Sequence, residues 1–294
     1  MFKLINNLRR NISANVRENP RIFRLFFVLR ALIILALVRA ILLANYDSAF
    51  VCLMSLVLFM IPSLMENGFK IKFSPIMEGS IYLFIYAAEI LGEVNHFYVA
   101  LPGWDTILHT INGFLAAAVG FSMIELLNKR SRNLYLSPFY LAFMAFCFSM
   151  TVGVLWEFFE FGADYFLGKD MQKDFIISSI GSVTLDPDNT QKVIHVRDIT
   201  QTVIHTASGE TVIIPGGYLD IGIIDTMKDL FVNFIGAVVY STIGYFSLKR
   251  NNTHSPSIAV YRSDDGDNLD DYNLAHDDGF EVDGDEFPSI YPPK

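Results

Sequence analysis

Six stretches of mostly apolar residues alternate with short polar connections along the first 250 residues of the chain. A helix needs about 20 predominantly apolar residues to cross a bilayer. The six stretches reach or approach that length, and the second is the shortest. They lie at roughly 22–45, 48–65, 76–98, 104–127, 138–167 and 223–248. The pattern predicts an all-α polytopic membrane protein whose residues 22–248 form a six-helix transmembrane bundle.

The connection after the fifth span is long and has a different pattern, because short runs of branched residues alternate with turn residues over 169–222. Strands are expected at 193–196, 199–204 and 211–214, and the residues 207–210 between the last two form a hairpin turn. A small external β-hairpin insertion is therefore predicted, which could cover a site at that end of the bundle. His195 and His205 could add ligands there, although histidines on surface strands usually have no such role.

Composition agrees with a membrane location, since 52% of the residues are hydrophobic and the mean hydropathy is +0.37. The net charge of −9 is carried by the tail: the residues after Arg250 have an excess of nine acidic side chains. Residues 249–294 also contain few branched aliphatic residues, which is typical of disorder. Cys52 and Cys147 both lie in apolar stretches, where a packing role is expected.

The positions of Lys and Arg predict the orientation, because cytoplasmic connections carry an excess of both. The segment 1–21 is basic, and the connections after the second, fourth and sixth spans contain Lys and Arg. The connections after the first and third spans contain neither. Both termini are therefore expected in the cytoplasm, and the connection 169–222 is expected outside.

Acidic and histidine residues gather where four of the spans reach the predicted outer boundary. Each group has spacings of three, four or seven residues, which places its members on one helix face. The four groups are Glu89, Glu93 and His96; Asp105 and His109; Glu157, Glu160 and Asp164; and Asp225, Asp229 and Asn233. Ionisable residues in a membrane span are costly and by default indicate a functional site.

Carboxylates and imidazoles on facing helices are the groups with which helix bundles bind divalent metal ions. We expect His109, Glu157, Glu160 and Asp229 to be the metal ligands, so the candidate cofactor is a divalent metal ion. His109 and Glu157 could equally act as a general acid and base. Asp105, Asp225 and Arg39 complete the predicted ligand-binding set, with Arg39 as an anion partner at matching depth.

Ordinary structural roles exist for several of these residues. Asp105 and Asp225 stand where a helix begins, and an acidic residue there is favoured by the helix dipole. Asn233 could simply form a hydrogen bond between helices. A shared site is the better explanation for His109 and Glu157, since each lies a turn or more inside an apolar helix.

Other function classes lack their motifs. The sequence contains no glycine-rich phosphate loop and no GxSxG nucleophile motif. A neutral membrane body and an acidic tail argue against binding of nucleic acid. Membrane lipids are the expected partners, and the sequence does not indicate an oligomeric state.

The motifs of residues 76–248 resemble those of the YjdF-like family of uncharacterised bacterial inner-membrane proteins. The motifs are Trp104-Asp105-x-x-x-His109, Trp156-Glu157-Phe158-x-Glu160 and Asp225-x-x-x-Asp229-x-x-x-Asn233. More distantly they are similar to the VanZ-like family, although Thr106 stands where that pattern has Lys. The resemblance implies a multi-pass protein of the bacterial plasma membrane, and the VanZ-like relatives suggest cell-envelope or lipid-linked chemistry.

The leading hypothesis is a polar site at the external membrane boundary that binds a metal ion and binds or acts on an envelope lipid or another amphiphile. Whether the protein is an enzyme stays open at this point. The alternative is an ion- or proton-coupled transporter that uses the same carboxylates. A scaffold that only binds partners is the third interpretation.

Overall fold

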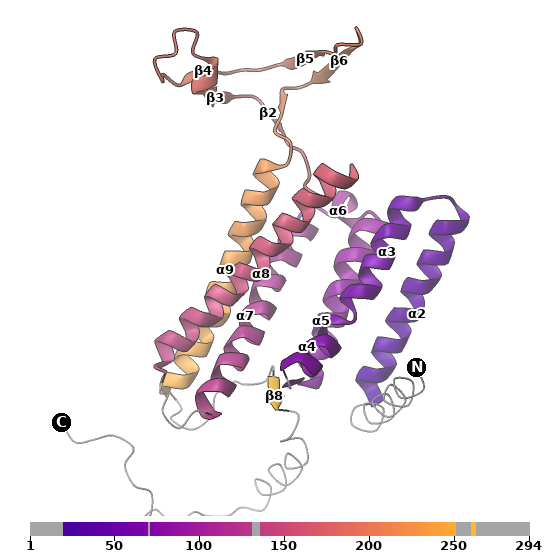
Figure 1. The fold of residues 1–294 in the computed structure, drawn as a ribbon, viewed down its shortest axis with the longest axis vertical. Coiled ribbons are helices and arrows are strands. Elements are labelled where there is room, and N and C mark those ends of the chain that lie inside the picture. Colours follow the sequence, from indigo (N-terminus) through magenta and orange to yellow (C-terminus); the bar gives the residue numbers. More distant parts are fainter. Residues whose placement is uncertain (1–19, 70, 131–135, 251–259, 263–294) are drawn as a thin grey trace, which may run out of the picture.

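The computed structural model describes residues 20–69, 71–130, 136–250 and 260–262, and it is a bundle of long helices with a group of short strands at one end (Figure 1). Five described helices or helix pairs are long and apolar enough to cross a membrane. They are α2 (Pro20–Leu42), α3 with α4 (Tyr46–Leu58 and Ile61–Phe69), α7 (Trp104–Arg130), α8 (Pro138–Leu167) and α9 (Ile223–Arg250).

The third predicted span is also present, but it combines two kinds of helix. Eleven residues of α-helix, α5 (Pro75–Ile85), continue directly into nine residues of π-helix, Tyr86–Val94. Ser74 caps this rod, since its hydroxyl accepts a hydrogen bond from the Met77 amide at 3.2 Å. The rod ends earlier than the sequence suggested, because His96 adopts a left-handed conformation with φ of 60°.

The predicted all-α polytopic membrane fold is confirmed, and several boundaries are corrected. The second span, expected over 48–65, is interrupted at Phe59 and Met60, where α3 ends and α4 begins. The fifth span has the predicted bounds, because Ser137 caps α8 and Gly168 ends it with φ of 61°. Residues 1–19 of the predicted N-terminal segment lie outside the described residues.

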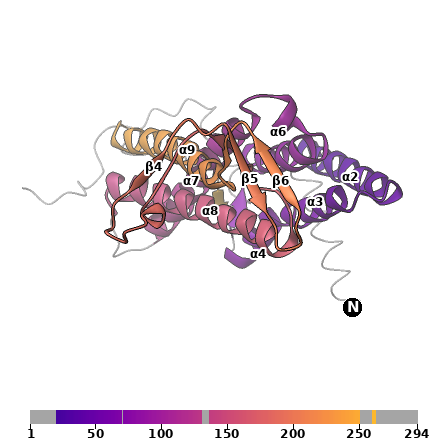
Figure 2. The ribbon, with the colours of Figure 1, turned by 90° about the horizontal axis from the view of Figure 1, so that it is seen from above.

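The helices pack as two groups. Figure 2 shows α7, α8 and α9 at one end of the elongated bundle and α2 and α3 at the other. The first group shares a buried core around Ala117, Phe121 and Ala237, and the second packs around Ile33, Phe59 and Tyr82. Many apolar side chains face outward, among them Phe158 at 67% exposure. Such a surface is suited to contact with lipid.

The chain between α8 and α9 forms short antiparallel strand pairs, as expected for the insertion. β5 (Gln201–His205) and β6 (Thr211–Pro215) form the predicted hairpin. The pairs β3 (Ile180–Ser182) with β4 (Ile194–Val196), and β2 (Ile176–Ile177) with β7 (Tyr218–Leu219), complete the insertion. The outer strands β3 to β6 stand away from the helices at the end of a narrow stem (Figure 1), so these strand pairs do not form the predicted cover over the bundle.

Most of the predicted disordered tail lies outside the described residues, and three of its residues depart from the prediction. Val260–Arg262 form strand β8, which pairs antiparallel with β1 (Ile71–Phe73). β8 lies at the end of the bundle opposite the insertion (Figure 1). Part of the tail therefore returns to the connection between α4 and α5.

Asp186 organises a turn in the insertion. Its carboxylate accepts hydrogen bonds from the amides of Asp188 and Thr190 and from the Thr190 hydroxyl, at 3.2, 2.7 and 2.8 Å. The hydrogen bond from Thr190 lowers the pKa of Asp186 below its ordinary value. A carboxyl group whose folded pKa is lowered stabilises the fold above its unfolded pKa, and this contribution is lost as the pH falls through the folded pKa.

Asp186→Ala is therefore expected to open this turn while the helices keep their stability. Hydrogen exchange of the amides in 186–192 should become faster at neutral pH, and wild type should show the same change only in acid. Asp188→Ala is the matched control, because the Asp188 side chain is exposed. Equal exchange rates in Asp186→Ala and wild type would contradict the assigned role.

Candidate functional site

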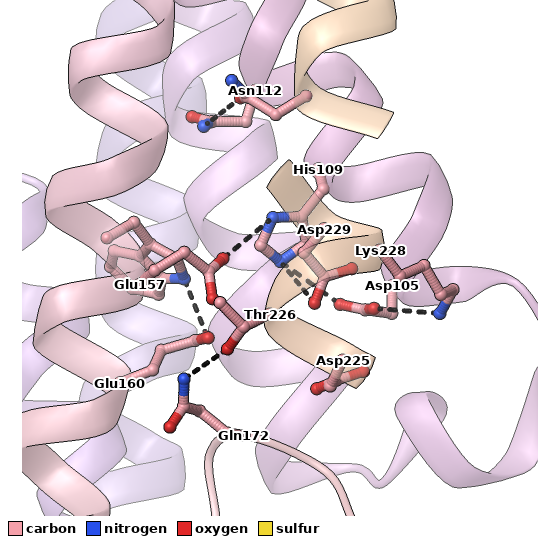
Figure 3. A network of polar contacts seen from close by, with 12 residues as sticks. Asp105, His109, Asn112, Glu157, Glu160, Gln172, Asp225, Thr226, Lys228 and Asp229 are labelled. Atoms are coloured by element: carbon pink, nitrogen blue, oxygen red, sulfur yellow. Dashed lines mark hydrogen bonds and ion pairs between the residues drawn. The ribbon is translucent and has the colours of Figure 1, made fainter. Parts of the chain in front are cut away.

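The polar ends of α7, α8 and α9 meet at the end of the bundle that carries the insertion. Asp105 and His109 lie on the first two turns of α7, and Asp229 lies on the second turn of α9. Of the His109 imidazole, Nε2 is 3.4 Å from Asp105 Oδ1 and 3.8 Å from Asp229 Oδ2. One ligand atom from each of the three residues falls within 4.8 Å of the other two. Figure 3 shows the three side chains pointing toward one another.

The second imidazole nitrogen of His109 faces another carboxylate. Nδ1 lies 4.0 Å from Oε1 of Glu157 on α8, and the Glu157 side chain is only 4% exposed. His109 therefore stands between Glu157 on one side and the pair Asp105 and Asp229 on the other (Figure 3). A carboxylate commonly orients a metal-binding histidine through its other ring nitrogen, and Glu157 stands on that side of His109, although 4.0 Å is longer than a hydrogen bond.

A cavity of about 160 Å³ opens beside this cluster and collects most of the predicted polar residues. Its walls come from the π-helical segment, the short helix α6 (Phe97–Ala100), α7, α8, α9 and residues 169–175, which form the stem of the insertion after α8. The lining residues are Glu89, Glu93, Tyr98, Gly103, Asp105, Trp156, Glu160, Met171, Lys173, Phe175, Asp225, Lys228 and Asp229. His109 and Glu157 are absent from this lining, so they stand behind Asp105 and Asp229.

Several carboxylate oxygens in this region are buried without a hydrogen bond. Glu89 Oε2, Glu157 Oε2 and Asp229 Oδ1 have no such partner among the described residues. Glu89 and Asp229 are 3% and 2% exposed. A buried carboxylate without a partner is costly, so buried charges are normally paired or coordinate a metal ion. These carboxylate oxygens are therefore suited to bind a cation.

Two lysines, which the sequence interpretation passed over, provide the positive charge at the cavity. Lys228 Nζ lies 3.6 Å from Asp105 Oδ2, and Lys173 Nζ lies 3.9 Å from Glu93 Oε1. The sequence does place Lys228 directly beside Asp229, but a lysine near a membrane boundary is common. No sequence pattern indicated a role for Lys173 at the site, because it lies in the long loop.

Arg39, the predicted anion partner, is not brought to the site. It is exposed near the end of α2, in the group of helices at the other end of the bundle, and it does not line the cavity. Depth in the membrane alone could not predict this, because depth does not say which helices are neighbours. His96 is also excluded, since the rod ends before it and its side chain is exposed.

Carboxylates also fix the stem of the insertion against the cavity. Asp225 Oδ2 accepts a hydrogen bond from the Lys173 amide at 2.7 Å, and Asp164 accepts hydrogen bonds from the amides of Met171 and Gln172 at 2.6 and 2.9 Å. Asp225 thus has a structural hydrogen bond besides its place in the cavity wall. Only this stem borders the cavity, and the strands that carry His195 and His205 contribute no lining residue.

Toward the middle of the membrane the polar region ends in a tight helix contact. Asn112 Nδ2 donates to Asn233 Oδ1 at 3.1 Å, and the Ser149 hydroxyl donates to the carbonyl of Gly113 at 2.7 Å. A Cβ on Gly113 would overlap the Asn233 carbonyl oxygen. α7 and α9 are therefore in backbone contact directly below the cluster, which fixes the relative positions of His109 and Asp229.

These features define a polytopic helical membrane protein with a buried carboxylate and histidine cluster at one membrane boundary. The chain belongs to the family described as predicted membrane protein (DUF2238). The model of this family matches residues 24–250. This membership is consistent with the YjdF-like resemblance, while the distant resemblance to the VanZ-like family stays a prediction. No curated protein and no solved structure matches the chain.

Proposed function

We propose that the protein binds a divalent metal ion through Asp105, His109 and Asp229, and that the bound ion helps it to bind or act on the headgroup of an amphiphile. The observation that carries this proposal is the close approach of three ligand atoms within 4.8 Å in a largely buried cluster. Two carboxylate oxygens and one imidazole nitrogen suit zinc, manganese or iron.

The surroundings of the cluster support a metal ion over a simple ion pair. A protonated His109 and Lys228 could together balance two carboxylates, but Asp105, Glu157 and Asp229 all approach the same ring. Asp229 Oδ1 and Glu157 Oε2 also have no hydrogen-bond partner among the described residues. Glu157 would orient His109, which revises its predicted catalytic role to a positioning role.

The cavity is where a bound ligand would meet the metal ion and the neighbouring charged side chains. When bound, a divalent metal would supply charge stabilisation for a carbonyl or phosphoryl oxygen. Lys228 would add a positive charge beside Asp105, and Glu160 is the carboxyl group of α8 that faces the cavity. Glu160 is therefore better placed than Glu157 to exchange a proton with a ligand.

The location at a membrane boundary supports an amphiphilic ligand. The cavity lies where α8 ends and α9 begins, and the same end carries exposed apolar residues such as Val99, at 82% exposure. The distribution of Lys and Arg favours the outer side of the plasma membrane for this end. An envelope lipid could then reach the cavity from the outer leaflet.

A transporter is less well supported by the packing. Below the contact of Asn112 and Asn233, the helices close around Ala117, Phe121 and Ala237, each at 0% exposure. An ion route would need a continuous line of polar groups or water. Ser122, Glu125 and Ser241 are buried further along α7 and α9, but this apolar layer lies between them and the cluster.

The test is the effect of metal on the melting temperature of purified protein. A chelator should lower the melting temperature of wild type, and added zinc or manganese should restore it. His109→Ala should remove the response, and Glu157→Gln should weaken metal affinity by about 10–100-fold, as for other outer partners of a metal-binding histidine. His96→Ala is the matched control, because His96 lies outside the site. A chelator response in His109→Ala equal to that of wild type would contradict the proposal.

A further inference from the structure

A second acidic group lines the cavity and belongs to different helices from the metal cluster. Glu89 and Glu93 come from the π-helical segment, and Glu160 comes from α8. Glu89 and Glu160 are 3% and 8% exposed. Glu89 Oε2 has no hydrogen-bond partner among the described residues, whereas Glu160 Oε1 accepts one from Trp156 Nε1 at 2.8 Å. The buried, unpartnered Glu89 oxygen indicates a positively charged ligand.

A bare metal ion does not fit this second group. Metal–oxygen bonds are about 2.0–2.6 Å long, so the ligand atoms must lie close together. Among the described residues, only Asp105, His109 and Asp229 bring three ligand atoms within 4.8 Å. Glu89, Glu93 and Glu160 share the wall of one cavity without meeting that condition. A larger cation is needed to contact them together.

The rest of the lining suits an organic ammonium group. Tyr98, Trp156 and Phe175 contribute aromatic rings to the cavity. A cation near an aromatic face is attracted by the ring, most strongly by tryptophan. A primary ammonium group also has three N–H donors, which carboxylates can accept.

One of the two positive charges at the cavity lies apart from this acidic group. Lys228 lies 3.6 Å from Asp105, beside the metal cluster, whereas Lys173 lies 3.9 Å from Glu93 and partly balances the charge of that carboxylate. A ligand with both an ammonium and a phosphate group would match the two kinds of charge. The exposed apolar residues Val99 and Leu101 at this end could contact its acyl chains.

We propose that Glu89 and Glu160, with Trp156 and Tyr98 beside them, bind the primary ammonium group of a zwitterionic phosphate ligand whose phosphate lies toward Lys228. The ligand class is an aminophospholipid headgroup or the corresponding free phosphoamine. This inference rests on the proposed function for the entry of an amphiphile into the cavity, and it adds the chemistry of the headgroup.

The experiment compares lipids that differ in the amine. Purified protein is titrated with phosphatidylethanolamine or phosphatidylglycerol of equal acyl chains, and binding is followed by native mass spectrometry and melting temperature. Wild type should prefer phosphatidylethanolamine by about tenfold, the effect expected for a hydrogen bond to a charged group. Glu89→Gln should reduce the preference to near unity.

Glu78→Gln is the matched control on the same helical rod. Glu78 is half-buried, its Oε1 accepts a hydrogen bond from the Tyr82 hydroxyl at 2.9 Å, and it does not line the cavity. It should keep the wild-type preference. Equal binding of the two lipids by wild type, or an unchanged preference in Glu89→Gln, would overturn the proposal. If Glu89→Gln does not fold, Glu160→Gln and the wild-type comparison still decide the question.

Two further measurements identify the source of the ligand and test the neighbouring metal site independently. Competition by free phosphoethanolamine would identify the soluble ligand, and selectivity for the lipid alone would identify the headgroup in the membrane. Metal content is measured in the same samples. A preference for phosphatidylethanolamine in protein that binds no metal would remove the metal proposal and leave the ammonium site standing. Metal binding without a lipid preference would remove the ammonium site and leave the metal proposal standing.

Discussion

Asp229→Asn is expected to weaken metal binding by about 100-fold or more, beyond the 10–100-fold typical of outer partners of metal ligands. Asp229 Oδ2 lies 3.8 Å from His109 Nε2, and its other oxygen has no hydrogen-bond partner among the described residues. An amide oxygen carries no full charge and is a poorer ligand for a transition metal. Isothermal titration of the metal-free proteins with zinc or manganese measures the change.

The same variant separates a metal site from an ion pair. If Asp229 exists to bind metal, removing its charge relieves repulsion with Asp105, and the metal-free variant should melt at a higher temperature than metal-free wild type. If Asp229 instead pairs with a protonated His109, its loss should lower that temperature. Asp188→Asn, in the exposed insertion, should change neither the affinity nor the melting temperature.

Gly236→Ala is expected to give one of the largest losses of stability among small substitutions in the bundle. A Cβ at Gly236 would overlap the Thr110 carbonyl oxygen and would crowd the Phe114 amide. Both are backbone atoms, so α7 and α9 must move apart. Overpacking commonly costs 1–3 kcal/mol, and a clash between backbones should cost about 3 kcal/mol or more. The free energy of unfolding in detergent, or the yield of folded protein, measures the effect.

Gly162→Ala is the matched control on α8. A Cβ at Gly162 has no atom within 4 Å, so this substitution should stabilise the helix by up to about 1 kcal/mol. Metal affinity should fall in Gly236→Ala and stay unchanged in Gly162→Ala, because only the first moves α9 relative to His109. Equal stability of the two variants would show that the helices tolerate separation.

The sequence predicted the membrane fold and most of the cluster for clear physical reasons. Apolar stretches of sufficient length and the Ser-Pro start of α8 determine where helices form. Spacing places Asp105 and His109 on one face of α7, and the alternating direction of successive spans brings their polar ends to one boundary. The structure accordingly gathers Asp105, His109, Glu157 and Asp229.

The missed features depend on contacts between distant segments. Lys173 reaches the cavity because the stem of the insertion is fixed by Asp225 and Asp164, which no local pattern reveals. Arg39 has the expected depth but lies on a helix remote from the cluster. Glu89 was predicted at this boundary and lines the cavity, but the π-helical segment that carries it was missed, because helical periodicity does not distinguish a π-helix from an α-helix over nine residues. The pairing of Val260–Arg262 with β1 also has no local signal.

Elemental analysis of purified protein tests the central claim most directly. Wild type equilibrated with zinc, manganese and iron and then freed of excess ions should retain one divalent metal ion per chain. Asp229→Asn and His109→Ala should retain almost none, and His96→Ala should match wild type. Wild type without bound metal, or the same metal content in all four proteins, would contradict the assignment of Asp105, His109 and Asp229 as a metal site.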